Sequence, residues 1–195
     1  MKKKLIISTY DDISNPYYGG GGAIAIHQTA KRLRHEFDVT VITGNYPGGK
    51  NENIDAVRYI RIGPAQAGPK LGQLVYQFLL PIELRRHVFD LWVESFTPPF
   101  STALLPLFTT KPVVALVHML SGEDMQRKYF LPFHLIEGIG LKTYRYFITP
   151  SEVIKQQIAR HNRKAEITTI ASGFEPLKLH QTSKKHLLFM GRIEM

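Results

Sequence analysis

Four consecutive glycines, Gly19 to Gly22, lie between a short apolar segment and an amphipathic one, and this placement suits the binding of an anion. Glycine lets the backbone take positive φ and come close to a ligand. A helix that begins directly after the glycines offers unpaired N–H groups and a partial positive charge. The sequence therefore predicts a phosphate site at this point of the chain.

Other residues that could do chemistry also follow apolar segments. Asp11 and Asp12 come after the first segment, His118 after a later one, and Ser151 after another. The two carboxylates could accept hydrogen bonds from substrate hydroxyl groups or could simply form a turn, and both interpretations stay open. For His118, a binding role and a hydrogen bond to the backbone are both open.

Apolar, β-branched segments alternate with helical patterns along the chain. We expect strands at residues 5–9, 38–43, 57–62, 89–93, 112–117, 146–149 and 167–170, and helices at 23–34, 71–82, 101–108, 123–143 and 150–161. Pro81 should kink or end the second helix. The alternation predicts an α/β fold with a Rossmann-like parallel sheet flanked by helices. Ligands bind at the carboxyl ends of such strands, where the residues above should converge.

The end of the chain differs from the rest. We expect one domain over residues 1–172, a linker over 173–185 that contains Pro176 and several basic residues, and the start of a second domain over 186–195. Leu187–Met190 is typical of a strand but has no evident pairing partner within the few residues that follow. The sequence therefore predicts a truncated C-terminal domain.

Composition limits the classes of function. The formal net charge is +9, which suits nucleic acid, anionic lipid or phosphorylated substrates. The aromatic residues fall mainly inside apolar segments, so we expect no nucleic-acid partner. The chain has no cysteine, which excludes disulfides and thiolate metal sites, and its histidines lack metal-ligand spacing. Its apolar segments are too short for a signal peptide or a membrane span.

Known phosphate loops narrow the interpretation of the glycines. A P-loop requires Gly-Lys-Ser/Thr, but Ala23 follows Gly22, so that motif is excluded. Residues 20–25 fit the dinucleotide pattern G-x-G-x-x-A, yet residues 10–18 separate them from the strand, and no acidic residue stands near Thr43 to bind a ribose. A turn without a ligand also stays open. A long first loop that ends in glycines at the mouth of a cleft is the favoured interpretation.

Five segments, in this order, resemble the N-terminal half of a retaining glycosyltransferase of the GT-B fold, in family 4 (glycosyltransferase group 1). They are the first strand and loop up to Gly22, then residues 38–43, 112–118, 146–151 and 170–175. Residues 188–194 resemble the first strand of the C-terminal domain, which in this family holds most of the nucleotide-sugar site. The sequence departs from the family pattern at Ala171-Ser172-Gly173, where the family usually has Pro-Asn-Gly.

The resemblance implies that a sugar is transferred, with retention, from a nucleotide-sugar donor to a sugar or lipid-linked acceptor. The nucleotide sugar is a substrate, and we expect no cofactor and no metal. The implied catalytic residue is His118, near the donor sugar. The expected substrate-binding residues are Gly19, Gly20, Gly21, Gly22, Asp12, Ser151 and, from across an interdomain cleft, Arg192. We expect the isolated chain to be inactive. The alternative is a non-catalytic α/β module that binds a phosphorylated or sugar ligand.

Two segments, residues 125–135 and 141–147, mix basic and large apolar residues. Such segments can lie on an anionic membrane, or their apolar residues can belong to the core while the basic residues face solvent. Both interpretations stay open. We expect a cytoplasmic protein. Peripheral contact with the inner face of the membrane and formation of a homo-oligomer both stay open.

Overall fold

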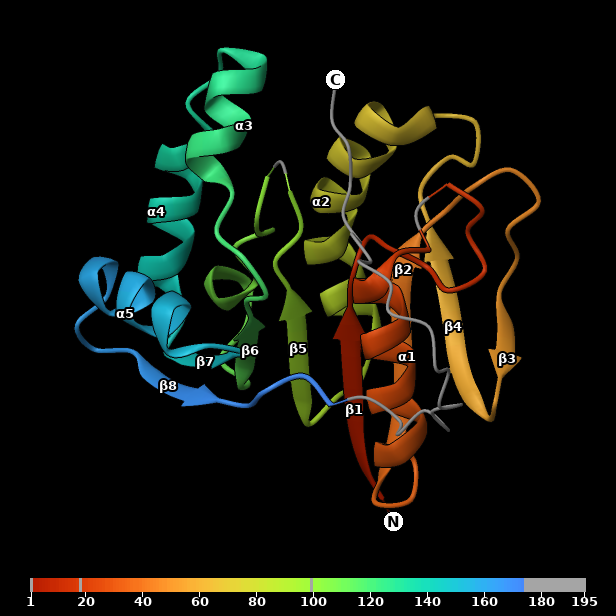
Figure 1. Ribbon diagram of the computed structural model, residues 1–195. Helices are drawn as coiled ribbons and strands as arrows, with labels where there is room; N and C mark the ends of the chain where they lie inside the picture. The colour runs from red at the N-terminus through yellow and green to blue at the C-terminus, as the bar shows by residue number, and fades with distance from the viewer. Residues whose placement is uncertain (1, 18, 99, 174–195) are drawn as a thin grey trace, which may run out of the picture.

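One sheet of eight strands forms the centre of the computed structural model, which describes residues 2–17, 19–98 and 100–173 (Figure 1). The strand order is β3-β4-β2-β1-β5-β6-β7-β8, and every neighbouring pair is parallel except β3 and β4. The predicted α/β fold with a Rossmann-like parallel sheet is therefore confirmed. The linker from residue 174 onward, the predicted second domain and Arg192 lie outside the described residues.

The strands agree closely with the apolar segments of the sequence. They are β1 (Lys3–Ser8), β2 (Phe37–Gly44), β3 (Glu52–Ile54), β4 (Val57–Ile62), β5 (Leu91–Ser95), β6 (Val113–Leu116), β7 (Tyr146–Thr149) and β8 (Glu166–Thr169). The short strand β3 was not predicted. It pairs with β4 through a tight turn at Asp55 and Ala56, whose φ angles of 50° and 61° suit a two-residue hairpin.

The helices differ from the prediction at three places. They are α1 (Gly21–Leu33), α2 (Gly68–Arg86), α3 (Gly122–Tyr129), α4 (Phe133–Thr143) and α5 (Glu152–His161), with a short 3-10 helix, η1 (Leu105–Phe108). The helix predicted over residues 101–108 is only this 3-10 helix, because Ser101 and Leu104 take left-handed φ angles of 60° and 57°. Pro81 does not end α2, whose last turn buries Leu84. The predicted helical region 123–143 is two helices, because Phe130 takes a left-handed conformation and Pro132 lacks an N–H.

Helices cover both faces of the sheet, and each strand sends alternate side chains to the two faces. On one face, Leu5 and Ile7 of β1 belong to a cluster with Ile26 and Ala30 of α1. On the other face, Ile6 belongs to a larger cluster, to which α2, α4 and α5 contribute the side chains Tyr76, Leu80, Leu84, Leu141 and Ile158. This double burial fixes the register of the strands, so the loops at their carboxyl ends start from defined positions.

Candidate functional site

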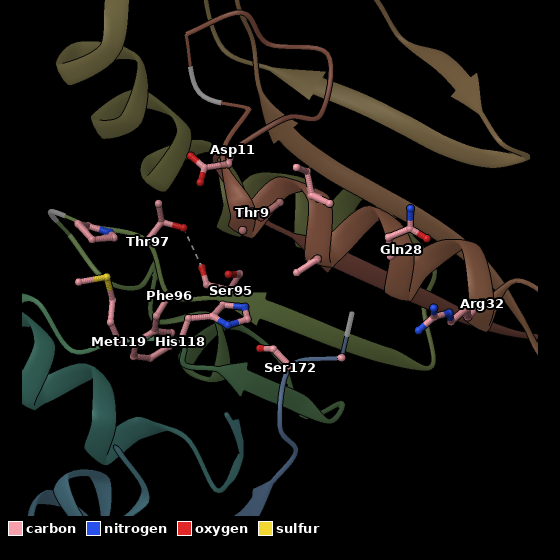
Figure 2. A pocket seen from close by; sticks show the side chains of 16 residues that line it. Thr9, Asp11, Gln28, Arg32, Ser95, Phe96, Thr97, His118, Met119 and Ser172 are labelled. Carbon is pink, nitrogen blue, oxygen red and sulfur yellow. Dashed lines mark hydrogen bonds between the residues drawn. The ribbon is translucent and has the colours of Figure 1, made fainter. Parts of the chain in front are cut away.

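A cavity of about 920 Å³ opens at the carboxyl ends of β1, β5 and β6, beside the beginning of α1 (Figure 2). Its walls come from five parts of the chain, one of which is Ser172 and Gly173 after β8. They include Thr9 and Asp11 after β1, Gly21 and Gly22 of α1, Ser95 to Thr97 around the end of β5, and His118 and Met119 after β6. The sheet thus brings together loops that are about 100 residues apart in sequence, as expected for a ligand site in a parallel α/β sheet.

The N-terminus of α1 faces this cavity without a side-chain cap. Gly20 is the N-cap residue, and within the described residues no side chain accepts a hydrogen bond from the first turn. Two other helices differ in this respect: a carboxylate accepts from the start of α3, and the Ser151 hydroxyl accepts from Ile154 N of α5 at 3.3 Å. The N-terminus of α2, like that of α1, has no side-chain cap from a described residue, but α2 does not line the cavity. The first N–H groups of α1 therefore remain available to an anion.

The four glycines have different roles. Gly21 and Gly22 line the cavity. Gly20 stands at the helix start, where a Cβ atom would meet nothing within 4 Å. Gly19 is packed against the backbone, since its Cβ would lie 2.8 Å from the carbonyl oxygen of Asn15. Of the predicted substrate-binding glycines, two are at the cavity and Gly19 is required for the close path of the loop.

The side chains of the two neighbouring aspartates lie in different surroundings. Asp12, predicted to bind substrate, is fully buried and does not line the cavity, because Arg61 holds it by hydrogen bonds of 2.8 and 3.1 Å and the Thr43 hydroxyl donates to it at 2.6 Å. Asp11 lines the cavity instead (Figure 2). Burial raises the pKa of Asp11. The carboxylate that can reach a ligand is therefore Asp11, and Asp12 anchors the loop to the sheet.

His118 is placed beside the cavity by an extension of β6. Val117 N donates to Ile148 O of β7 at 2.9 Å, and His118 follows directly. Its Nε2 atom is buried, and no described residue forms a hydrogen bond with it. Burial lowers the pKa of His118 below its ordinary value, so the imidazole is neutral at pH 7. A buried polar atom without a protein partner at a cavity wall is free to bond a ligand.

Two buried glutamates hold the loops that form the wall around His118. The carboxylate of Glu94 accepts from Thr102 Oγ1 at 2.9 Å, from Ala103 N at 2.6 Å and from the hydroxyl of Tyr144. Burial raises the pKa of Glu94. These bonds fix the loop that runs from β5 towards η1, which contributes Thr97 and Pro98 to the cavity.

The second of these glutamates, Glu137, connects three segments. Its Oε2 atom accepts from Ser101 Oγ at 2.9 Å, from Ser121 N at 3.0 Å and from Gly122 N at 3.1 Å. It therefore ties α4 to the loop after β5 and to the start of α3, which follows His118. Neither glutamate was predicted to hold these loops, because each has partners that lie far away in the sequence.

The remaining predicted residues lie elsewhere. Ser151 follows β7 at the same edge of the sheet, but its hydroxyl caps α5 and it does not line the cavity. Arg192 is outside the described residues. A cation that was not predicted, Arg32, lines the far end of the cavity from α1. Over the described part of the chain, no cluster of three or more His, Asp or Glu side chains is arranged to hold a metal ion.

The chain is similar to a known protein family in sequence and to solved structures in fold. A family model described as Glycosyltransferase Family 4 matches residues 19–176. The structure is similar to a sucrose-phosphate synthase from Thermosynechococcus elongatus, with a TM-score of 0.64 and 14% identity over 87% of this chain and 48% of that one. A second structure of the synthase gives a TM-score of 0.58 at 14% identity, over 88% of this chain and 90% of that one.

At such low identity the similarity shows the fold alone. The chain spans about half the length of the first synthase chain, 48%. No curated protein sequence matches the chain.

Proposed function

The chain belongs to Glycosyltransferase Family 4, and we propose that it forms the acceptor-side domain of a retaining glycosyltransferase. The donor is a nucleotide sugar, and the acceptor is a sugar or a lipid-linked sugar. One observation carries the proposal: the N-terminus of α1, which no described side chain caps, and His118, whose Nε2 has no hydrogen-bond partner among the described residues, line the same 920 Å³ cavity. Both are suited to a sugar that is joined to a diphosphate.

The departure of a nucleoside diphosphate determines what catalysis must supply. Negative charge develops on the diphosphate as the bond to the sugar breaks, so positioned donors and positive charge stabilise the transition state. The backbone N–H groups of Gly21 and Gly22, with the dipole of α1, offer such donors. We propose that they bind the diphosphate and that Arg192 adds a cation from a second domain.

His118 acts in this proposal on the sugar. A neutral imidazole carries one N–H donor and one acceptor nitrogen, and it can hydrogen-bond a hydroxyl group of the donor sugar. The buried Nε2 atom gains a partner only when the sugar is bound, so the bond would favour one orientation of the sugar. The carboxylate of Asp11 lies beside the start of α1, with Oδ2 3.4 Å from the position of a Cβ atom on Gly22, and we propose that it accepts from an acceptor hydroxyl.

Calorimetric titration of the chain with uridine diphosphate and guanosine diphosphate tests the phosphate site. The key variant is Gly21→Asp, which puts a carboxylate in the first turn of α1, where a Cβ atom meets nothing within 4 Å. A negative charge there stabilises the helix but competes with phosphate. We expect binding to weaken at least about tenfold without any loss of thermal stability. Gly21→Ala is the matched control and should bind like the unchanged chain.

Equal affinity of the Gly21→Asp variant would overturn the assignment of the phosphate site. The same samples are also incubated with nucleotide sugars and assayed for release of nucleoside diphosphate. We expect binding without turnover from this chain, because the proposed site includes residues from a second domain. Turnover at an ordinary enzymatic rate would contradict that division of the site. If nucleotide binds and the chain remains inactive when a complete second domain is added, the non-catalytic binding module is the better account.

A further inference from the structure

Large apolar side chains point to solvent where α3 and α4 meet. We name residues 127–135 the α3–α4 corner; it lies at the upper left of Figure 1. Phe130 is 91% exposed, more than any other large apolar side chain that the structure describes, and Leu131 and Leu135 are each 55% exposed. An exposed group of this kind marks an interaction surface more often than a solvent-facing corner.

The corner is a firmly packed element of the fold. Phe133 is 4% exposed, and its ring lies 5.3 Å from that of Phe100 and 6.0 Å from that of Tyr129, both nearly edge-on. Phe130 N donates to Gln126 O at 2.8 Å, and the φ angle of Phe130 is 58°. A bulky residue is unfavourable in that conformation. The fold therefore keeps Phe130 exposed where a smaller polar residue would suit the backbone better.

Cations surround these apolar side chains. Lys70, from the first turn of α2, and Lys128 lie 5.3 and 5.9 Å from the ring of Tyr129. Arg127 is also exposed, but its charge is shared with the acidic side chains Glu123 and Asp124 at 3.8 and 3.7 Å. Both acids stand at the opposite end of α3. Near the tip, neither Lys70 nor Lys128 forms an ion pair with a described residue, so their charges are available to a partner.

One exposed stripe continues the surface along α4. Leu135, Ile139 and Lys142 are spaced at i, i+4 and i+7, so they share one side of the helix, and Ile139 is 57% exposed. Apolar side chains with lysines at both ends form the pattern of an element that lies in the plane of a membrane surface. Exposed apolar side chains next to lysines match the boundary of an anionic bilayer, where acyl chains and lipid phosphates lie close together.

We propose that the α3–α4 corner binds an anionic membrane, with Phe130 and Leu131 in the boundary between headgroups and acyl chains and Lys70 and Lys128 on lipid phosphates. The start of α3 follows the segment of His118 and Met119 that lines the cavity, so α3 connects the corner to the rim of the cavity. The inference names a partner for the proposed reaction, namely a membrane that carries a lipid-linked acceptor. Membrane binding itself does not depend on sugar transfer.

Sedimentation with vesicles tests the proposal on the whole chain. Vesicles of phosphatidylcholine with about one-third phosphatidylglycerol should bind the chain at least about tenfold more tightly than phosphatidylcholine alone, and salt should reduce the difference. Phe130→Asn should weaken binding about tenfold, and asparagine is tolerated at positive φ, so the variant should fold. Lys128→Glu replaces one cation by an anion and should also weaken binding, by at least about fivefold.

The matched control is Phe78→Asn, on α2, where the side chain is 72% exposed. It should bind vesicles like the unchanged chain. If it lost as much vesicle binding as Phe130→Asn, any exposed apolar side chain would contribute equally, and the proposal would be overturned. Absence of binding to anionic vesicles, or a dimer in solution that Phe130→Asn dissociates, would also overturn it. Titration of Phe130→Asn with uridine diphosphate separates this test from that of the proposed function, since the cavity should bind nucleotide normally.

Discussion

Replacing Glu137 by alanine should loosen the wall of the cavity that carries His118. Glu137 lies on α4, and its Oε2 atom accepts from Ser101 Oγ, Ser121 N and Gly122 N at 2.9 to 3.1 Å. The serine hydroxyl can turn to another partner, but the two backbone N–H groups cannot. Ser121 is 3% exposed, so water has little access to them.

The expected loss of stability follows from the two backbone N–H groups that are left without an acceptor. Each buried N–H that loses its partner costs about 1–3 kcal/mol, so Glu137→Ala should lower the free energy of unfolding by about 2–6 kcal/mol. Glu137→Gln keeps an oxygen that can accept the same bonds. It loses only the favourable interaction of the carboxylate with the N-terminus of α3, about 0.3–1 kcal/mol.

Chemical denaturation of the two variants and the unchanged chain measures both differences. Glu36→Ala, at an exposed position, is the control and should stay within about 0.5 kcal/mol. The alanine variant should also bind a uridine diphosphate sugar more weakly than the unchanged chain, since His118 and the start of α3 lose their common support. Equal destabilisation by alanine and glutamine would refute the reasoning, because it would mean that the carboxylate charge, and not the accepting oxygen, holds the loops.

Two further outcomes are expected. Gly19→Ala should reduce stability by about 1–3 kcal/mol in thermal unfolding, because the new Cβ would lie 2.8 Å from the Asn15 carbonyl oxygen. The control is Gly20→Ala, which should be tolerated because a Cβ atom there lies in open space. Equal effects of the two substitutions would contradict the packing at Gly19. Asp11→Asn should raise stability at neutral pH. Because burial raises the pKa of Asp11 above its ordinary 3.8, its contribution is fully present below pH 3.8 and is lost as pH rises through the folded-state pKa. Denaturation at several pH values should therefore show the variant's advantage disappear in acid.

The sheet could be predicted from the sequence because burial on both faces produces continuous apolar segments. Seven of the eight strands follow such segments, to within two residues at most of their ends. The exception is β3, which has three residues and depends on a turn at Asp55 and Ala56. A strand this short has no periodic pattern that would predict it. The continuation of α2 past Pro81 could not be predicted either, since it depends on the burial of Leu84 in the folded core.

The site could be predicted only in outline. Glycines and a histidine that follow strands must meet at one edge of a parallel sheet, and Gly21, Gly22 and His118 do line one cavity. The adjacent residues Asp11 and Asp12 could not be distinguished, because their orientation is decided by Arg61, which is 49 residues away from Asp12.

The supporting glutamates were missed for a related reason. Glu94 and Glu137 look like ordinary charges in their segments, and their partners lie up to 50 residues away in sequence. A carboxylate that holds two loops is recognisable only after the fold brings those loops to it.

The central claim is that the cavity binds a diphosphate at the N-terminus of α1, with His118 beside the sugar. The most direct measurement is an NMR titration with uridine diphosphate and then with a uridine diphosphate sugar. The account predicts that the amide signals of Gly21 and Gly22 shift with both ligands and that the ring signals of His118 shift with the sugar nucleotide alone, while the amide of Gly48, in the loop after β2, stays unchanged. Unchanged signals at Gly21 and Gly22 at saturating ligand would contradict it.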